Sequence, residues 1–112
     1  MTLRQKQSLF VQLAARLIAH IYEQGYELTF GEAYRSPEEA ARLAKAGKGI
    51  VQSLHTQKLA LDINLFKAGV YLSSTEAHRQ FGEWWERQHE LCRWGGRFND
   101  GNHYSLTHGG RS

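Results

Sequence analysis

One segment constrains the fold more than any other, because it places an acid inside an apolar strand. Residues 59–66 read LALDINLF, and this run of apolar and β-forming residues predicts a strand. Side chains alternate along a strand, so Asp62 shares a face with Ala60 and Asn64. An unpaired carboxylate inside a protein is unfavourable, and burial raises its pKa unless it finds a partner. The sequence therefore predicts that Asp62 is paired, and a metal ion is one such partner.

Three helices are expected along the chain. Apolar residues recur at steps of three and four within residues 5–24, as in an amphipathic helix. Residues 36–47 open with Ser-Pro-Glu-Glu, in which the serine is a natural N-cap and the glutamates favour the positive end of a helix. A third helix is expected over residues 74–92, capped by Ser74 or Thr75 and with Cys92 as a buried thiol at the end of its apolar face. Residues 45–53 contain two glycines and are expected to form a loop.

Strands account for the rest of the predicted elements. Residues 26–34 alternate and are rich in β-forming residues. The strand at residues 59–66 is expected to form a hairpin with residues 70–72, and a short strand is expected at residues 103–106 in a glycine-rich tail. The sequence therefore predicts one small α+β domain over residues 1–112, with an antiparallel sheet and flanking helices.

Composition excludes several classes of function. A single cysteine excludes a disulfide framework and a cysteine-rich zinc knuckle. Fourteen Lys and Arg against eleven Asp and Glu give a net charge of +3 that is dispersed along the chain, so we expect no nucleic-acid partner. No apolar run approaches the roughly 20 residues of a membrane span, and none follows a basic N-terminus. We therefore expect a soluble, cytosolic monomer with neither membrane insertion nor a signal peptide.

Both aspartates of the chain lie near histidines. His55 precedes Asp62 by seven residues, and Asp100 precedes His103 by three in a glycine-rich segment. Two imidazoles and one carboxylate are a normal three-ligand set for catalytic zinc, and the remaining acid is then available as a general base. Two alternatives stay open: Asp62 caps a turn or pairs with an arginine, and His103 is a hydrogen-bonded histidine of the core.

Three sequence motifs add a family resemblance. SLHTQKLALD at residues 53–62 resembles the S-x-H-x-x-G-x-A-x-D signature of the D-alanyl-D-alanine carboxypeptidase type of zinc peptidases. This family includes VanX- and VanY-like enzymes and the L-alanyl-D-glutamate endopeptidases found as phage endolysins. WGGRFNDGNHYSL at residues 94–106 is similar to the endopeptidase branch, and GEAYRSPEEA at residues 31–40 resembles the family's Tyr-Arg-Ser segment. The motifs follow the family's order, and the resemblance implies a Hedgehog/DD-peptidase-like fold.

The resemblance also implies roles for individual residues. One Zn²⁺ would be held by His55, Asp62 and His103. Asp100 would be the catalytic base, where the carboxypeptidase branch has glutamate, and Arg35 would lie near the scissile carbonyl, where its charge suits an oxyanion or a substrate carboxylate.

Further residues near the motifs have less definite expectations. Ser53 is expected to hydrogen-bond a metal ligand or the substrate, and Tyr34 and Tyr104 either line the cleft or only pack. Lys58 stands where the motif has glycine, so the loop is expected to differ if that position needs a positive φ. The remaining histidines are expected on helix surfaces or, for the last, in a solvated tail or at the substrate rim: His20, His78, His89 and His108.

The function implied by the resemblance is hydrolysis of a peptide bond in the peptidoglycan stem peptide. The L-alanyl-D-glutamate bond is the first choice, and the D-alanyl-D-alanine bond is the alternative. We expect a phage or prophage endolysin that stays in the host cytoplasm and reaches the wall through a separate pore. An alternative from another class is a metal-stabilised wall-binding module without catalysis, but such a module has no need of Asp100.

Overall fold

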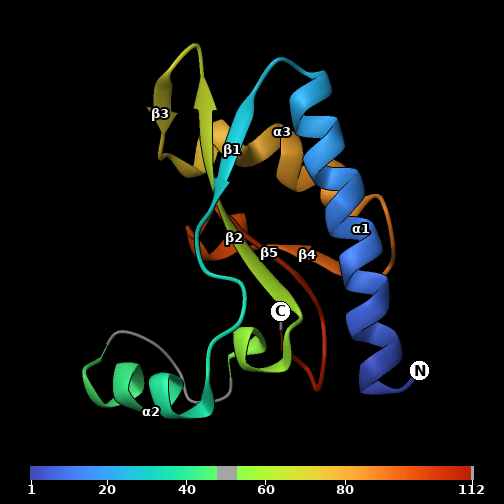
Figure 1. Cartoon of the computed structure of the whole chain (residues 1–112), viewed down its shortest axis with the longest axis vertical. Coiled ribbons are helices and arrows are strands. Elements are labelled where there is room, and N and C mark those ends of the chain that lie inside the picture. Colours follow the sequence, from blue (N-terminus) through green and yellow to red (C-terminus); the bar gives the residue numbers. More distant parts are fainter. Residues whose placement is uncertain (48–52, 112) are drawn as a thin grey trace.

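An antiparallel sheet built around one long strand forms the centre of the computed structural model, which describes residues 1–47 and 53–111 (Figure 1). β1 and β3 pair with the second half of β2, whereas β5 pairs with its first half and β4 pairs with β5. The strands are β1 (Glu27–Phe30), β2 (Ala60–Lys67), β3 (Val70–Leu72), β4 (Cys92–Trp94) and β5 (His103–Leu106). The predicted α+β class and antiparallel sheet are thus confirmed.

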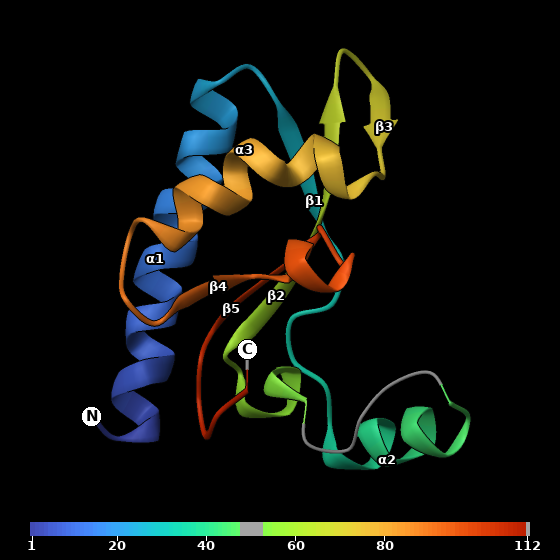
Figure 2. The same ribbon diagram turned by 180° about the vertical axis from the view of Figure 1, so that it is seen from behind.

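Helices α1 and α3 pack against the sheet, whereas α2 lies apart from it (Figures 1 and 2). The serines predicted as N-caps act as such: the hydroxyls of Ser36 and Ser74 each accept a hydrogen bond at 3.1 Å from the backbone N–H three residues later. The helical segments are α1 (Leu3–Glu23), α2 (Pro37–Lys45) and α3 (Thr75–Glu86), with the short 3₁₀ helices η1 (Leu54–Gln57) and η2 (Gly95–Phe98).

The core is centred on Trp85 of α3, which is fully buried. Its ring makes edge-to-face contacts with Phe10 of α1 and Tyr104 of β5, with ring centroids 5.9 Å and 6.1 Å apart. Its indole N–H is shared between the carbonyls of Arg93 and Ser105, both at 3.1 Å. One side chain thus joins both helices to β4 and β5. The predicted apolar stripe of α1 is buried against this core: Phe10, Leu13, Leu17 and Ile21.

The third helix is shorter than the sequence predicts. It ends at Glu86, and the residues around Cys92 form β4, which pairs with β5. The Glu86 carboxylate accepts a hydrogen bond at 3.0 Å from the N–H of Trp94. Cys92 is fully buried, as expected, but as part of the sheet. The expectation of a helix to Cys92 was wrong, because pairing with β5 and burial outweigh local helix propensity.

Two other predicted segments differ in extent. The first strand ends at Phe30 instead of residue 34, although the next two residues still bond to β2. Of the loop expected at residues 45–53, Lys45 ends α2 and Ser53 caps η1, and residues 48–52 lie outside the described residues. Among the described residues, no helix combines the length and apolar character that crossing a membrane requires.

Candidate metal centre

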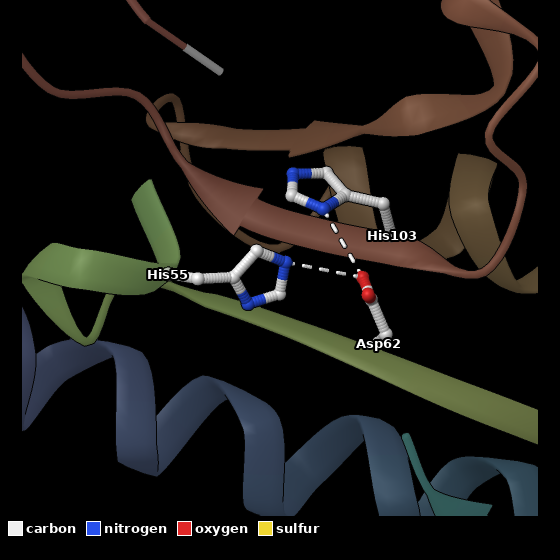
Figure 3. A group of neighbouring side chains, drawn as sticks. All are labelled: His55, Asp62 and His103. Carbon is white, nitrogen blue, oxygen red and sulfur yellow. Dashed lines mark hydrogen bonds and ion pairs between the residues drawn. The ribbon is translucent and has the colours of Figure 1, made fainter. Parts of the chain in front are cut away.

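Three side chains from three different elements converge at one point, as Figure 3 shows. Asp62 Oδ1 lies 3.3 Å from His55 Nε2 and 3.2 Å from His103 Nδ1. The ligand atoms offered by the three residues all lie within 4.8 Å of one another. Asp62 thus has the partners that the sequence predicts, and these partners are the two predicted histidines.

Strand pairing fixes the backbone of two of these residues, and a serine hydroxyl holds the backbone of the third. Asp62 and His103 stand opposite each other in the register of β2 and β5. His55 lies on η1, where its backbone N–H donates to the hydroxyl of Ser53 at 3.2 Å. Ser53 is itself buried, so it holds the histidine's backbone from the interior. A side-chain hydrogen bond from Ser53 to a metal-ligating imidazole or to a substrate is not among these contacts and remains a prediction.

The ring of His55 is oriented by the segment that follows β1. Its Nδ1 lies 2.9 Å from the carbonyl oxygen of Ala33, which only accepts, so Nδ1 carries the proton. Nε2 then points toward Asp62, to which it donates when the ring is protonated, whereas in the neutral ring its lone pair is free for a metal ion. The backbone N–H of Arg35 also donates to the His55 carbonyl at 3.0 Å. Two hydrogen bonds thus join the segment after β1 to η1, one at the ring of His55 and one at its backbone. A second partner on the far ring nitrogen is typical of metal-ligating histidines.

The donor set fits a tetrahedral zinc ion. Zn–N and Zn–O bonds of about 2.1 Å at tetrahedral angles place neighbouring ligand atoms about 3.4 Å apart. The two separations from Asp62 Oδ1, 3.2 and 3.3 Å, are close to that edge length, and the ligand atoms of the two histidines lie within 4.8 Å of each other. Two imidazoles and a carboxylate leave a fourth position open. His55, Asp62 and His103 could therefore hold a metal ion.

The charges of the three groups depend on one another. Burial alone would raise the pKa of Asp62, but hydrogen bonds from His103 and His55 outweigh burial and bring this pKa to about 2. Burial acts to lower the pKa of His55, yet hydrogen bonds to Asp62 and Ala33 raise it above its usual value. Asp62 is therefore a carboxylate at any pH at which the protein would work, as a metal ligand must be.

Arg35 lies beside the centre and is paired with an acid that the sequence did not single out. Its guanidinium forms an ion pair with Glu32, and its side chain is only 14% exposed. Glu32 Oε1 is also 3.8 Å from His55 Nδ1. The only sequence signal for Glu32 was its place in the GEAYRS motif, three residues before the arginine.

Asp100 stands in a tight turn ahead of β5. Its N–H donates to the Gly95 carbonyl at 3.0 Å, and its own carbonyl accepts from the His103 N–H at 3.1 Å. A Cβ atom on Gly95 would approach the Asp100 carbonyl oxygen to 2.3 Å, so this turn requires glycine there. Asp100 is exposed, and its carboxylate makes no hydrogen bond or ion pair within the described residues. The backbone next to His103 is thus fixed, while the Asp100 carboxylate stays available.

The structure separates the two tyrosines. Tyr34 is 52% exposed, and Lys58 Nζ lies 5.3 Å from its ring centroid. Tyr104 is fully buried, and its hydroxyl is hydrogen-bonded to His78 Nδ1 at 3.0 Å. The idea that Tyr104 lines a cleft was therefore wrong, because its neighbour His103 faces the centre and strand alternation turns Tyr104 into the core.

Lys58 adopts the conformation that the family's glycine would favour. It ends η1 with φ +58° and ψ +36°, in the left-handed region. The expectation that the loop must differ was wrong. The turn keeps a positive φ, and a lysine occupies it.

Three histidines lie in places that the sequence did not indicate, and one of them, His89, follows the end of α3 instead of lying on the helix surface. His78 is 1% exposed, not on a helix surface, and burial lowers its pKa to about 4. Its spacing from Phe81 and Trp85, at i+3 and i+7, was a usable signal for the buried face. His108 lines a cavity of about 360 Å³ on another side of η1, and its Nδ1 lies 3.1 Å from Lys6 Nζ. It is partly buried and is not part of the metal centre.

Two solved structures resemble this one over most of its length. The L-Ala D-Glu endopeptidase ChiX of Serratia marcescens matches with a TM-score of 0.68 and 23% sequence identity, covering 94% of this chain and 83% of that one. The chain has the fold of this peptidase. The vancomycin resistance D,D-pentapeptidase VanY of a VanB-type resistance cassette, in complex with Zn(II), matches with a TM-score of 0.61 and 17% identity over 87% of this chain and 70% of that one.

The expected resemblance is therefore confirmed at the level of the fold. No protein-family profile and no curated protein sequence matches the chain. Function is therefore inferred from the residues of the candidate metal centre, because overall sequence similarity does not indicate it.

Proposed function

We propose that this protein is a zinc metallopeptidase that hydrolyses a peptide bond of the peptidoglycan stem peptide. The observation that carries the proposal is the convergence of His55, Asp62 and His103, whose ligand atoms lie within 4.8 Å of one another. The fold supports it, because two similar structures are an L-Ala D-Glu endopeptidase and a D,D-pentapeptidase in complex with Zn(II). These three residues would hold one Zn²⁺.

The chain's own residues supply the rest of the chemistry. A bound zinc ion provides a Lewis acid that polarises a carbonyl and lowers the pKa of water. The exposed carboxylate of Asp100 takes a proton from the attacking water and passes it to the departing amine. The guanidinium of Arg35 stabilises the negative charge that develops on the carbonyl oxygen. Tyr34, which is half-exposed and next to Arg35 in the sequence, would contact the substrate.

The proposed bond is the one between L-alanine and D-glutamate. The motif at residues 94–106 and the likeness to ChiX support this choice. The D-alanyl-D-alanine bond is the second candidate, which the likeness to VanY supports. The finer role is that of a phage or prophage endolysin, which the endopeptidase-like motif also supports.

Mass spectrometry of purified sacculi after digestion tests the proposal. We expect new N-terminal D-glutamate ends, whereas free D-alanine would select the carboxypeptidase activity. Asp100→Ala should abolish hydrolysis while zinc content stays near one ion per chain, and Glu90→Ala, which removes another exposed acid, should leave hydrolysis unchanged. Neither product from washed sacculi with zinc present would overturn the proposal in favour of a wall-binding module.

The endolysin role has its own test. Bacteria that express the chain internally should lyse only after their inner membrane is made permeable. Lysis that begins on expression alone would contradict storage in the cytoplasm before release.

A further inference from the structure

Glu32 lies between two residues of the proposed site. Its carbonyl accepts a hydrogen bond from the Asp62 N–H at 2.7 Å, which continues the pairing between the chain after β1 and the centre of β2. Its Oε1 pairs with the Arg35 guanidinium and lies 3.8 Å from His55 Nδ1. One carboxylate thus faces both a metal ligand and the arginine assigned to the scissile carbonyl.

The pair is less open to water than the Glu–Arg pairs on the helices, since the side chain of Arg35 is 14% exposed and that of Glu32 is 34% exposed. Within the pair, Glu32 Oε1 and Arg35 Nε are buried atoms without a hydrogen-bond partner among the described residues, and the ion pair is made through Nη2 of Arg35. By contrast, Arg79 and Glu76 of α3, which also stand three residues apart, have side chains 49% and 74% exposed. Exposed pairs contribute little, whereas removing one partner of a buried pair leaves a charge without compensation. Arg35 therefore depends on Glu32 for its charge balance and its orientation.

Glu32 also acts on the imidazole of His55. The Nδ1–H of His55 donates to the Ala33 carbonyl, and the Glu32 carboxylate adds negative charge on the same side of the ring. Outer partners of this kind orient a metal-ligating imidazole and make it a stronger donor at its other nitrogen.

We propose that Glu32 is a positioning residue that holds the Arg35 guanidinium beside the metal centre and strengthens His55 as a metal ligand. The inference rests on the proposed function, because it assigns a task to a neighbour of the proposed active site. Glu32 acts through Arg35 and His55 and does not itself contact the reacting atoms. Its loss should therefore reduce turnover and metal affinity without removing the metal ligands.

Kinetics and zinc binding test this role with three variants. Glu32→Gln keeps the size of the side chain but removes its charge, and Glu32→Asp keeps the charge but shortens the reach. We expect Glu32→Gln to lower kcat and the affinity for zinc, measured by chelator competition, by about 10- to 100-fold, with KM changed less. Glu32→Asp should recover part of this loss. Glu76→Gln, the exposed control, should stay within about twofold of the wild type. Wild-type kcat and zinc affinity in Glu32→Gln would overturn the proposal.

A double-variant cycle separates positioning from general destabilisation. Arg35→Lys keeps the positive charge but lacks the guanidinium fork. If Glu32 acts through that fork, the loss of kcat in Glu32→Gln should shrink in the Arg35→Lys background. Equal factors in both backgrounds would show independent effects and would contradict positioning of Arg35.

A spectroscopic measurement keeps the test independent of activity. The buried Arg35 Nε–H should give a slowly exchanging ¹⁵N–¹H signal, which Arg35→Lys identifies by its loss. Glu32→Gln should shift this signal and speed its exchange with water, and an unchanged signal would argue against the pair. If the wild type hydrolyses no wall peptide, the proposed function fails, while this signal and the zinc affinity still decide the role of Glu32.

Discussion

Replacing Lys58 by glycine and by alanine measures backbone strain beside the metal centre. Lys58 has φ +58° and ψ +36° and lies three residues after His55. A residue with a Cβ atom loses about 1–2 kcal/mol in this region, which glycine adopts freely. About 0.5–1 kcal/mol of this advantage of glycine over alanine is offset, because the unfolded chain has more conformational entropy at a glycine. We therefore expect Lys58→Gly to be more stable than Lys58→Ala by about 0.5–1 kcal/mol.

The lysine side chain decides how both variants compare with the wild type. Lys58 Nζ lies 5.3 Å from the centroid of the half-exposed Tyr34 ring. A cation–π contact at an exposed site contributes about 0.5–1 kcal/mol, and both variants lose it. Lys58→Ala loses this contact and keeps the strain, so it should fall below the wild type by that amount. Lys58→Gly should lie close to the wild type, because strain relief offsets the lost contact.

Urea unfolding followed by circular dichroism at pH 7 gives the two free energies of unfolding. Arg16 in the exposed middle of α1 provides the matched control. There the order should reverse, with Arg16→Gly less stable than Arg16→Ala by about 1 kcal/mol. If Lys58→Ala equals or exceeds Lys58→Gly in stability, the position is not left-handed in solution and the argument for strain beside His55 is wrong.

Three further predictions concern the core and the metal centre. Because burial lowers the pKa of His78 to about 4, its contribution to stability is complete above pH 6.5 and is lost as the pH falls toward 4. The free energy of unfolding that is lost amounts to about 3 kcal/mol. The free energy of urea unfolding should therefore vary less with pH in His78→Gln than in the wild type. An equal variation with pH in both proteins would contradict the buried neutral ring. Gly82→Ala should lower the free energy of unfolding by about 1–3 kcal/mol, because the new Cβ would lie 2.0 Å from the Trp94 ring. This loss should outweigh the higher helix propensity of alanine. An unchanged Tm would refute the close packing of Gly82 against Trp94. His103→Ala should lose bound zinc and the rise in Tm that zinc produces in the wild type, and zinc retained at full stoichiometry would remove His103 from the ligand set.

Much of the fold could be predicted because local and long-range signals agree there. The apolar stripe of α1 and the caps of α2 and α3 are local patterns, and the structure keeps them. The end of α3 could not be predicted, because no glycine or proline marks it. What ends the helix is the pairing of Cys92 with Leu106, and such a contact is invisible in the local sequence.

The candidate site likewise contains residues that the sequence indicated and residues that it did not. Asp62 within an apolar strand signalled the need for partners, and the family motifs indicated which histidines supply them. Glu32 and His78 carry weaker signals: Glu32 has only its place in the GEAYRS motif, and His78 has only its helical spacing from Phe81 and Trp85. Their importance comes from the register of β2, which brings the chain after β1 to Asp62, and from the burial of one face of α3.

The candidate metal centre is made of residues from two distant parts of the chain, which the pairing of β2 with β5 brings together. His55 and Asp62 precede the exposed turn at Ala68 and Gly69, and His103 lies 41 residues after Asp62. A chain still being synthesised therefore has no complete ligand set until β5 is made and has added to the sheet. A cut in that turn should yield two fragments that bind zinc as a three-ligand centre only when mixed, so zinc binding can report their reassembly.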